Sequence, residues 1–358
     1  YQLTYFGIMF TNIYSLLPEE LANKIKIEQL GSPVYRTKQL LFWLYKSYIN
    51  EPDKMSNLPA EFKTYLLNNY SFYLPETDSK LVSSDKAIKY RLKLEDNELI
   101  ESVLIPTEKK NTLCISTQVG CGRNCQFCST AKMGLIRNLY NYEIVGQVIY
   151  AARQLKSSDN KKLTNLVLMG MGEPLDNLDN VLSALRILQS QEGLSFSPRR
   201  ITVSTSGVVP GIIALADSGI KAKLALSLTS AIDSKRSKLM PVNKQYNLIE
   251  LKQALLYYLR KSSYRITIEY ILIPSFNMDD DDLKALSKYV GDLSCKINFI
   301  PYNPGKDSIF RAPTVKEIND FMYRAQSLPQ AITLRKSRGA DIFGACGQLN
   351  KNNLGAKI

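Results

Sequence analysis

Hydrophobic and polar positions over most of this chain alternate between two patterns. Short runs rich in Val, Ile and Leu, typical of buried strands, recur between stretches whose apolar residues return every three or four positions, as in amphipathic helices. The strand-like runs are TLCIS (112–116), NLVLMG (165–170), RITVST (200–205), KLALSL (223–228), TIEYILI (267–273) and INFIP (297–301). Strands alternating with helices predict an α/β fold whose parallel sheet is closed into a barrel or left open and doubly wound.

The first part of the chain follows a different pattern. Apolar residues recur at helical spacing in PEELANKI, YRTKQLLFWLYKSYI and LPAEFKTYLLNNY, which predicts a small group of helices. A polar hinge is expected near 79–85, followed by two alternating strands, AIKYRLKLE and ELIESVLIP. We therefore expect a helical accessory domain over 1–85, either a plain bundle or an RNA-docking module, and an α/β domain over 86–358.

Composition adds a partner class to this picture. The chain has 358 residues, of which 45% are hydrophobic and 22% charged, as in ordinary globular proteins. Lys and Arg outnumber Asp and Glu by 46 to 33, a formal net charge of +13, which favours nucleic acid or another polyanion as a partner. No run approaches the roughly 18 apolar residues of a membrane span. We therefore expect a cytoplasmic protein that does not bind membranes.

Unusual polar residues follow most of the predicted strands. They are CGRNCQFC after the first strand, Gly172, Glu173 and Pro174 after the second, the STSG turn (204–207) after the third, Thr229 and Ser230 after the fourth, and Asn303 after the sixth. In (β/α) barrels the carboxyl ends of the strands meet at one rim, where catalytic residues gather. The sequence therefore predicts one active site at that rim.

Three cysteines, Cys121, Cys125 and Cys128, have the spacing C-x3-C-x2-C in a chain without histidine. Six cysteines in all are too few for a disulfide scaffold, and this clustering indicates metal or redox chemistry in a reducing compartment. Thiolates bind zinc or iron–sulfur clusters. A zinc site would recruit Cys114, Cys295 or Cys346 as its fourth ligand, as in a non-catalytic zinc RNA-binding protein. On a [4Fe-4S] cluster, three ligands would leave one iron open to a substrate or cofactor.

At these residues the chain resembles the radical S-adenosylmethionine (SAM) enzymes, through the cysteine loop and the GEP that follows the second strand. More narrowly, it resembles the RlmN type of ribosomal and transfer RNA adenine C2-methyltransferase. The segments that carry this resemblance, in order, are YRTKQLLFWLY, QVGCGRNCQFCSTAKMGLIRNL, LVLMGMGEPLDN, PRRITVSTSGVVPGI, RSKLMPVNKQYNL and RGADIFGACGQL. In the related Cfr-type C8-methyltransferases two positions differ, and Pro174 and Ser206 fit the C2 type better.

The resemblance implies a partial (β/α)6 radical-SAM barrel that acts as a monomer on ribosomal RNA, and on tRNA as well. It implies a [4Fe-4S] cluster on the three loop cysteines, reduced by a donor such as flavodoxin or ferredoxin. It also implies a set of SAM contacts: Gly172 and Glu173 at the ammonium, Ser204, Ser227, Leu228 and Thr229 at the ribose and carboxylate, and Asn303 at the adenine. Thr229 departs from the family, which often has His or Asn there.

Adenine C2 carries no nucleophilic lone pair, so ordinary methyl transfer from SAM cannot reach it. The resemblance implies that Cys346, among small neighbours in GACGQL, accepts a methyl group from one SAM. A radical derived from a second SAM then converts it to a methylene radical that adds to the base. Cys114 would release the RNA through a transient disulfide with Cys346, and Glu101 would accept the C2 proton. By periodicity alone, Glu101 would face solvent on its strand, and Cys295 is interpreted as a core residue.

Four arginines lie beside these motifs, namely Arg199, Arg200, Arg335 and Arg338. Guanidinium groups commonly contact nucleic-acid phosphates, which fix the register of the complex. The same residues could equally belong to a solvated face.

Overall fold

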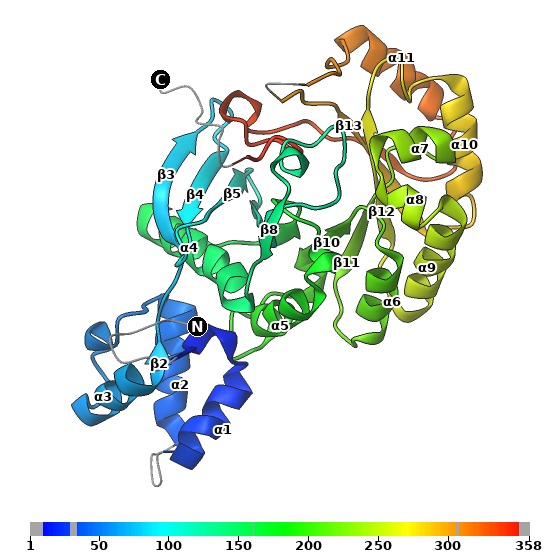
Figure 1. Cartoon of the computed structure of the whole chain (residues 1–358). Helices are drawn as coiled ribbons and strands as arrows, with labels where there is room; N and C mark the ends of the chain where they lie inside the picture. Colours follow the sequence, from blue (N-terminus) through cyan, green and yellow to red (C-terminus); the bar gives the residue numbers. More distant parts are fainter. Residues whose placement is uncertain (1–9, 29–33, 160, 306–307, 351–358) are drawn as a thin grey trace.

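The computed structural model describes residues 10–28, 34–159, 161–305 and 308–350. Its main sheet has ten strands in the order β14-β13-β12-β11-β10-β9-β6-β5-β4-β3 (Figure 1). The six predicted runs form the parallel strands β6 (Asn111–Cys114), β9 (Asn165–Leu168), β10 (Ile201–Thr205), β11 (Lys223–Ser227), β12 (Ile266–Leu272) and β13 (Cys295–Pro301). The predicted α/β fold, with six parallel strands in a partial barrel, is confirmed.

Both edges of the parallel sheet carry additional strands. At one edge, β5 (Leu99–Pro106), β4 (Ile88–Lys93) and β3 (Glu76–Val82) pair in antiparallel fashion. The segment 79–85, expected as a hinge, is therefore part of β3 and its turn into β4. At the other edge, the short β14 (Ile332–Leu334) pairs in parallel with β13. We propose that the domain boundary lies before β3, within 72–75.

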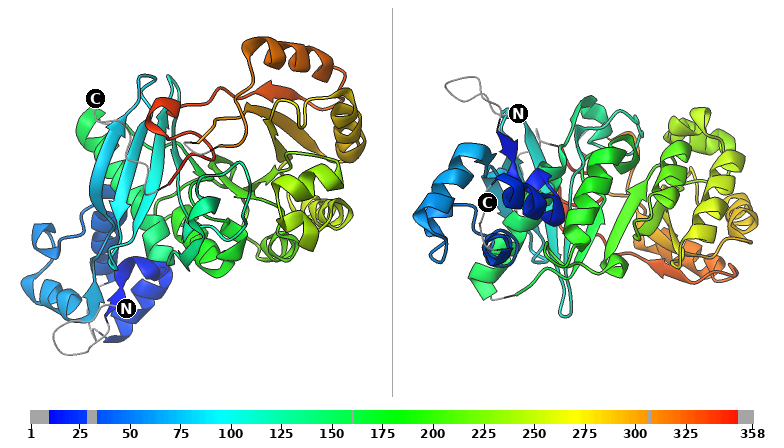
Figure 2. Two further views of the ribbon diagram at one scale, coloured as in Figure 1. Left: turned by 45° about the horizontal axis from the view of Figure 1, so that its top comes forward. Right: turned by 90° about the horizontal axis from the view of Figure 1, so that it is seen from below.

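Helices cover the outer face of the parallel sheet, as Figure 2 shows from two sides. They are α4 (Asn141–Asp159), α5 (Leu178–Gln189), α6 (Val209–Asp217), α9 (Leu248–Lys261), α10 (Asp280–Val290) and α11 (Val315–Ala325), with the short α7 (Asp233–Leu239) and α8 (Val242–Gln245) between β11 and α9. In α9 an Asn247–Glu250 capping box starts the helix, and Leu251, Leu255 and Tyr258 turn one apolar stripe toward the core. Such stripes bury the strands from outside and leave the strand ends free for the site.

The N-terminal region is helical, as predicted. It contains α1 (Pro18–Glu28), α2 (Val34–Phe42) continued by a π-helical turn (Trp43–Ser47), and α3 (Ala60–Asn69). The two-residue strands β1 (Thr11–Asn12) and β2 (Tyr70–Ser71) pair in parallel at its base. Hydrogen bonds from α4 attach it to the barrel, because Asn141 Nδ2 donates to Ser15 O at 2.7 Å and Arg153 Nε to Tyr48 O at 2.9 Å.

None of the helices in the described residues combines the length and the apolar character needed to span a bilayer.

Candidate active site

The cysteine loop is held at its base by a two-stranded ribbon, β7 (Gln118–Gly120) with β8 (Leu135–Asn138). Gly120 has a φ of +77°, and a Cβ there would lie 1.9 Å from Gly134 O. The same carbonyl accepts a hydrogen bond from Cys121 N at 2.9 Å. Only glycine fits this approach, so Gly120 fixes where the first cysteine of the loop begins.

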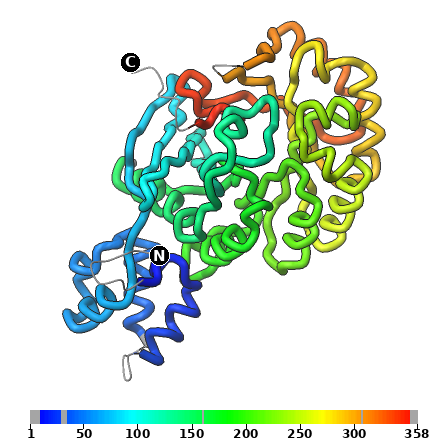
Figure 3. Tube along the Cα trace, viewed as in Figure 1, coloured from blue at the N-terminus to red at the C-terminus, as the bar shows by residue number. Residues whose placement is uncertain are grey.

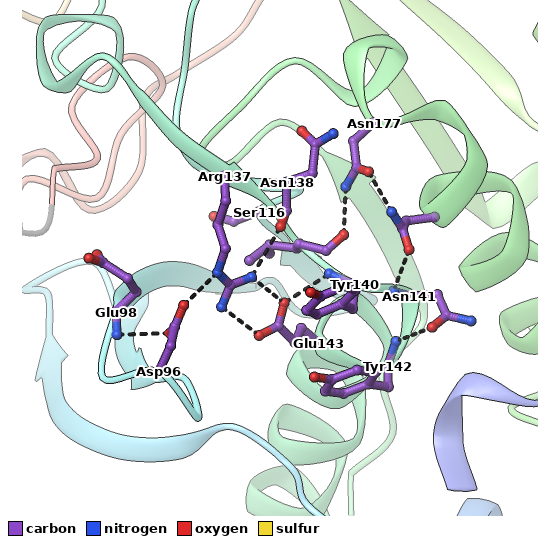
Figure 4. A network of polar contacts seen from close by, with 12 residues as sticks. Asp96, Glu98, Ser116, Arg137, Asn138, Tyr140, Asn141, Tyr142, Glu143 and Asn177 are labelled. Carbon is purple, nitrogen blue, oxygen red and sulfur yellow. Dashed lines mark hydrogen bonds and ion pairs between the residues drawn. The ribbon is translucent and has the colours of Figure 1, made fainter. Parts of the chain in front are cut away.

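A polar network anchors the ribbon to the rest of the molecule (Figure 4). The Arg137 guanidinium donates to both carboxylate oxygens of Glu143 at 2.8 and 2.9 Å, and to Asp96 Oδ2 at 2.6 Å. Glu143 is almost fully buried in the first turn of α4, and its carboxylate also accepts from Tyr140 N. The network joins β8 to α4 and to the β4–β5 turn. It therefore fixes the ribbon of β7 and β8 that holds the base of the cysteine loop.

We expect Arg137→Met to lower the free energy of unfolding by about 2 to 3 kcal/mol, because it leaves the Glu143 carboxylate buried without its cation. The iron content of purified protein should fall with it, since β8 closes the cysteine loop. Urea titration and iron analysis measure the two effects. The matched control is Arg311→Met, which breaks a bidentate but exposed pair with Glu317 and should cost at most about 1 kcal/mol. Equal losses in both variants would contradict this role.

The three loop cysteines share one cavity with residues from the carboxyl ends of β9 to β13. Its polar and sulfur-bearing lining comprises Cys121, Arg123, Cys125, Cys128, Thr130, Met169, Glu173, Ser204, Thr205, Ser206, Ser227, Met240, Glu269, Arg335 and Cys346, and Gly172 also lines it. Burial raises the pKa of the Cys121 thiol to about 12 and raises that of Cys128, so these sulfurs become thiolates only with a compensating cation. Across the described ranges, no three His, Cys, Asp or Glu side chains are arranged to hold a single metal ion. Three thiols from one short loop that line a common cavity fit three irons of a [4Fe-4S] cluster.

The Gly172–Glu173 turn forms one wall of this cavity and is fixed on every side. Gly172 has a φ of +100°, and a Cβ there would lie 2.6 Å from the Gln118 side chain. Glu173 Oε2 accepts from Ser206 N at 2.7 Å and Oε1 from Leu175 N at 3.1 Å, while Gln118 Oε1 accepts from Glu173 N. Burial raises the pKa of Glu173 and these backbone donors oppose the rise. The carboxylate is therefore held rigidly beside the cysteine loop, where it could meet an ammonium group.

A buried arginine ties together the strand ends that carry the serines. Arg236 is fully buried and donates to Ser206 O at 2.5 Å, to Leu228 O at 3.2 Å and to Asn243 Oδ1 at 2.9 Å. Burial lowers its pKa to about 10, so the guanidinium remains a cation at neutral pH. By joining the ends of β10 and β11, Arg236 keeps Ser204 and Ser227 in the cavity lining.

Three predicted SAM contacts do not line the cavity. Leu228 is a core residue that donates its backbone N–H to Glu269 O. Thr229 is fully buried with a φ of +62°, and its hydroxyl has no hydrogen-bond partner. Asn303 donates to Ser337 Oγ at 2.7 Å. Their assignment as SAM contacts stays a prediction.

A second cavity adjoins the first. It is lined by Cys114 at the end of β6, by Ile105, Met169 and Ile300, and by the C-terminal segments 335–338 and 344–349. Cys346 and Arg335 line both cavities, so the Cys346 thiol stands between the cysteine loop and Cys114. Burial, followed by the charge of Cys346, raises the pKa of Cys114 to about 12, and Arg335 opposes this rise. Cys114 and Cys346 are free thiols.

The C-terminal segment that carries Cys346 crosses the cysteine loop, as the red and teal segments of Figure 3 show. Gly347 O accepts from Ser129 N at 2.7 Å, and Leu349 O accepts from Thr130 Oγ1 at 2.6 Å. Asn350 N donates to Glu101 Oε2 at 2.9 Å. These contacts hold the C-terminal segment against both the cysteine loop and Glu101, but Glu101 itself lines neither the cavity of the loop cysteines nor the cavity of Cys114.

Glu101 is buried rather than exposed. Only 1% of the residue is accessible, and Lys89 Nζ on β4 lies 2.9 Å from Glu101 Oε1 with 2% of its side chain accessible. Burial raises the pKa of Glu101, while the Lys89 ammonium and the Asn350 N–H oppose the rise. A carboxylate in this setting can act as a base, because burial raises its proton affinity and Lys89 limits that rise.

Sequence reasoning missed three charged residues of the site. One is Arg123, within the cysteine loop, which lines the cysteine cavity and donates from Nε to Asp176 Oδ2 at 2.6 Å. Glu269 of β12 and Arg335, just after β14, line the cysteine cavity, with Arg335 Nη1 3.9 Å from Glu269 Oε1. An isolated Glu within the apolar run TIEYILI was the available signal for Glu269. Arg335, considered only as a phosphate contact, follows a strand that was not predicted.

Of the remaining arginines of the sequence analysis, two lie away from the site and one lines the second cavity. Arg199 and Arg200 precede β10 and are exposed at the amino ends of the strands, opposite the site. Arg338 lines the second cavity and donates to Asp85 O at 2.9 Å.

Comparison with known proteins gives consistent results over nearly the whole chain. Residues 115–286 match the radical SAM superfamily, and residues 11–71 match the ribosomal RNA large subunit methyltransferase N-terminal domain. A probable dual-specificity RNA methyltransferase RlmN from Cytophaga hutchinsonii is 40% identical, covering 94% of this chain and 92% of that protein. The dual-specificity RNA methyltransferase RlmN of Campylobacter jejuni is 38% identical over 95% of this chain and 97% of its own length. A radical SAM methyltransferase structure from Sphaerobacter thermophilus superposes with a TM-score of 0.90 at 38% identity, over 95% of this chain and 99% of that one.

Proposed function

The chain belongs to the RlmN family of radical SAM RNA methyltransferases, and on this premise we propose that it methylates C2 of an adenine in ribosomal RNA and in tRNA through Cys346. Family membership makes it an enzyme that uses a [4Fe-4S] cluster and SAM. The alternative of a non-catalytic zinc protein is therefore wrong. The observation that carries the proposal is that Cys346 lines both the cavity of the three loop cysteines and the cavity of Cys114.

When bound, the cluster and SAM supply a methyl group and a hydrogen-abstracting radical. We propose that Cys121, Cys125 and Cys128 hold the cluster, and that Glu173 and the serines at the ends of β10 and β11 hold SAM. This is supported by their shared cavity and by the rigid Glu173 carboxylate, which suits the SAM ammonium. Arg335, which lines both cavities, is available to stabilise a Cys346 thiolate during methyl transfer.

Cys346 then carries the one-carbon unit to the base. We propose that its sulfur accepts the methyl group, and that after hydrogen abstraction the methylene carbon bonds to adenine C2. This radical adduct loses the C2 proton to Glu101 and also loses one electron, which the cluster would accept, so that the ring becomes aromatic again. The Cys114 thiolate then attacks Cys346 Sγ and forms a disulfide, and the pair of electrons from the broken S–CH2 bond stays on carbon, which gains a proton and becomes the methyl group.

The position of the new methyl group tests this function. The reconstituted enzyme with SAM, a one-electron reductant and an unmodified ribosomal RNA transcript should yield 2-methyladenosine on digestion to nucleosides. A transcript carrying deuterium at adenine C2 should lose that deuterium from each methylated base. Retention of the C2 deuterium together with 8-methyladenosine would instead establish the C8 reaction of the related Cfr type.

We expect Glu101→Gln to slow release of methylated RNA by about 10²- to 10⁴-fold, because amide oxygen is too weak a base for the C2 proton. Covalent RNA–protein adduct should still form, and gel electrophoresis of stopped reactions separates adduct from free RNA. Glu76→Gln, an exposed carboxylate on β3 of the same sheet, is the matched control. Full turnover by Glu101→Gln would exclude Glu101 as the base.

We expect Lys89→Met to change the pH profile rather than only the rate. A base works when deprotonated, so the rate of release falls as pH falls through the pKa of Glu101. Burial already raises that pKa and Lys89 lowers it, so removing the ammonium should move the acid limb of the profile to higher pH. A slower enzyme with an unmoved acid limb would mean that Lys89 only supports the fold.

We further propose that the protein acts as a monomer in the cytoplasm, where its RNA substrates are made. Its cluster would receive electrons from a low-potential donor such as flavodoxin or ferredoxin.

A further inference from the structure

A wide groove of about 680 Å³ lies beside the second cavity, and most of its charged side chains are cations. Its charged residues are Lys86, Lys109, Lys110, Lys161, Lys162 and Arg338, against Asp85 and Glu108. Thr107 and Arg338 line both the groove and the cavity of Cys114 and Cys346. The groove is thus continuous with the site at which the base would react.

The walls of the groove are preformed. Asn111 Nδ2 donates to Lys162 O and Asn111 N to Thr164 Oγ1, both at 3.0 Å. Thr107 N donates to Lys110 O at 2.7 Å and closes the turn between β5 and β6. The two lysine-bearing loops, 107–110 and 161–164, are therefore fixed side by side, so little order has to be gained when a ligand binds.

Four lysines of the groove have no carboxylate partner in the part of the chain that the structure describes. Lys86, Lys109, Lys110 and Lys162 are exposed, and within the described ranges none of them has a carboxylate at salt-bridge distance. The carboxylate of Asp85 instead accepts from Ala87 N at 3.0 Å and Gly339 N at 2.9 Å. Burial and the charges of Lys296, Arg200 and Lys110 lower the pKa of Lys223, which shows that the cationic surface continues along the amino ends of the strands. Like charges held together in this way favour a polyanion.

We propose that this groove binds the phosphate backbone of the substrate RNA and leads the strand to the cavity of Cys114 and Cys346. This inference rests on the proposed function, in which the RNA base reacts at the cavity of Cys114 and Cys346. β6 runs from Asn111, at the groove, to Cys114 in the cavity, a separation of about 10 Å at roughly 3.3 Å per residue. Flexible lysine ammoniums suit sequence-independent phosphate contacts, which set position rather than base identity.

The test is the triple variant K109Q/K110Q/K162Q, with K284Q/K288Q/K316Q as control. The control removes the same charge from exposed positions on α10 and α11. Affinity for an unmodified ribosomal RNA transcript is measured by fluorescence anisotropy over a series of KCl concentrations. Each lost phosphate contact should lower the slope of log K against log[salt] by about 0.7 to 0.9, so the groove variant should lose about 2 to 3 in slope and about 100-fold in affinity near 0.1 M salt. The control should change affinity less than twofold.

Equal losses of RNA affinity in the two triple variants would contradict RNA binding by the groove, because they would reflect only the change in net charge. Unchanged binding in both would overturn it as well. Because binding is measured without SAM or reductant, a failure of C2 methylation would not alter this readout. At saturating RNA the groove variant should keep the kcat of the parent enzyme, with the effect confined to KM; a lost kcat with normal affinity would contradict a docking role.

Discussion

Replacing Cys346 with Ala is expected to leave the RNA unmethylated and free of protein, whereas Cys114→Ala should trap RNA covalently on the enzyme. In the proposed reaction the carrier thiol acts before any bond to the base exists and the resolving thiol acts after it, so the two losses should stop the reaction on opposite sides of the adduct. The arrangement of the cavities supports this order, because Cys346 lines both cavities and Cys114 only the second.

Removal of Cys114 should trap nearly all of the bound RNA on the enzyme, because no other thiol in the described part of the chain is placed to release it. Burial raises its pKa to about 12, so it is a poor nucleophile until a nearby cation or proton acceptor helps to form the thiolate. In the described segments, Cys114 is the only other cysteine that lines the second cavity with Cys346. Without it, no thiol is positioned to attack Cys346 Sγ.

Protein purified from cells and digested with nuclease and protease provides the measurement. Cys114→Ala should give a Cys346 peptide with the mass of a methylene-linked nucleotide, and Cys346→Ala should give none. Cys295→Ala is the matched control, since Cys295 is a buried core residue of β13, as the sequence analysis expected. Free or simply methylated Cys346 in the Cys114→Ala protein, together with normally methylated RNA, would refute the division of roles.

The parallel strands were predictable because their residues obey local rules. Runs such as KLALSL become buried strands, and the polar residues after them meet at one rim. β3 escaped prediction because it is the outermost strand of the sheet and its sequence ETDSKLV is largely polar and exposed. An edge strand with little buried area has no hydrophobic periodicity to detect.

Glu101 shows why the site itself could not be read from periodicity. Its neighbour Ser102 donates to Gln147 of α4, while Glu101 contacts Lys89 and the C-terminal Asn350. β5 is therefore covered on both faces, and alternation along it does not separate core from solvent. The covering segment comes from the far end of the chain, as the red strip beside β5 in Figures 1 and 2 shows. Arg335 is likewise far in sequence from most residues of the site, so its position between the two cavities could not be predicted.

Replacing any one of Cys121, Cys125 and Cys128 with Ala is expected to reduce iron from about four atoms per chain to nearly none, and methylation with it. In the proposed site each sulfur holds one iron of the cluster, so the loss of one thiolate removes a protein bond that the cluster needs. Absorption near 400 nm and iron analysis of anaerobically purified protein measure the loss. Cys295→Ala should retain full iron and colour.

Cys346→Ala makes this second prediction discriminating, because Cys346 lines the same cavity as the three loop cysteines. If Cys346 carries the methyl group, its sulfur is not a ligand, and Cys346→Ala should keep all of the iron while losing all of the methylation. If it were the fourth ligand of a four-thiolate centre, Cys346→Ala would lose metal as the loop variants do. Full iron in the triple loop variant would likewise be incompatible with the proposed site. Three ligands and one carrier require two separate effects. The loop cysteine variants should lose iron, whereas Cys346→Ala should lose the RNA adduct and keep the iron.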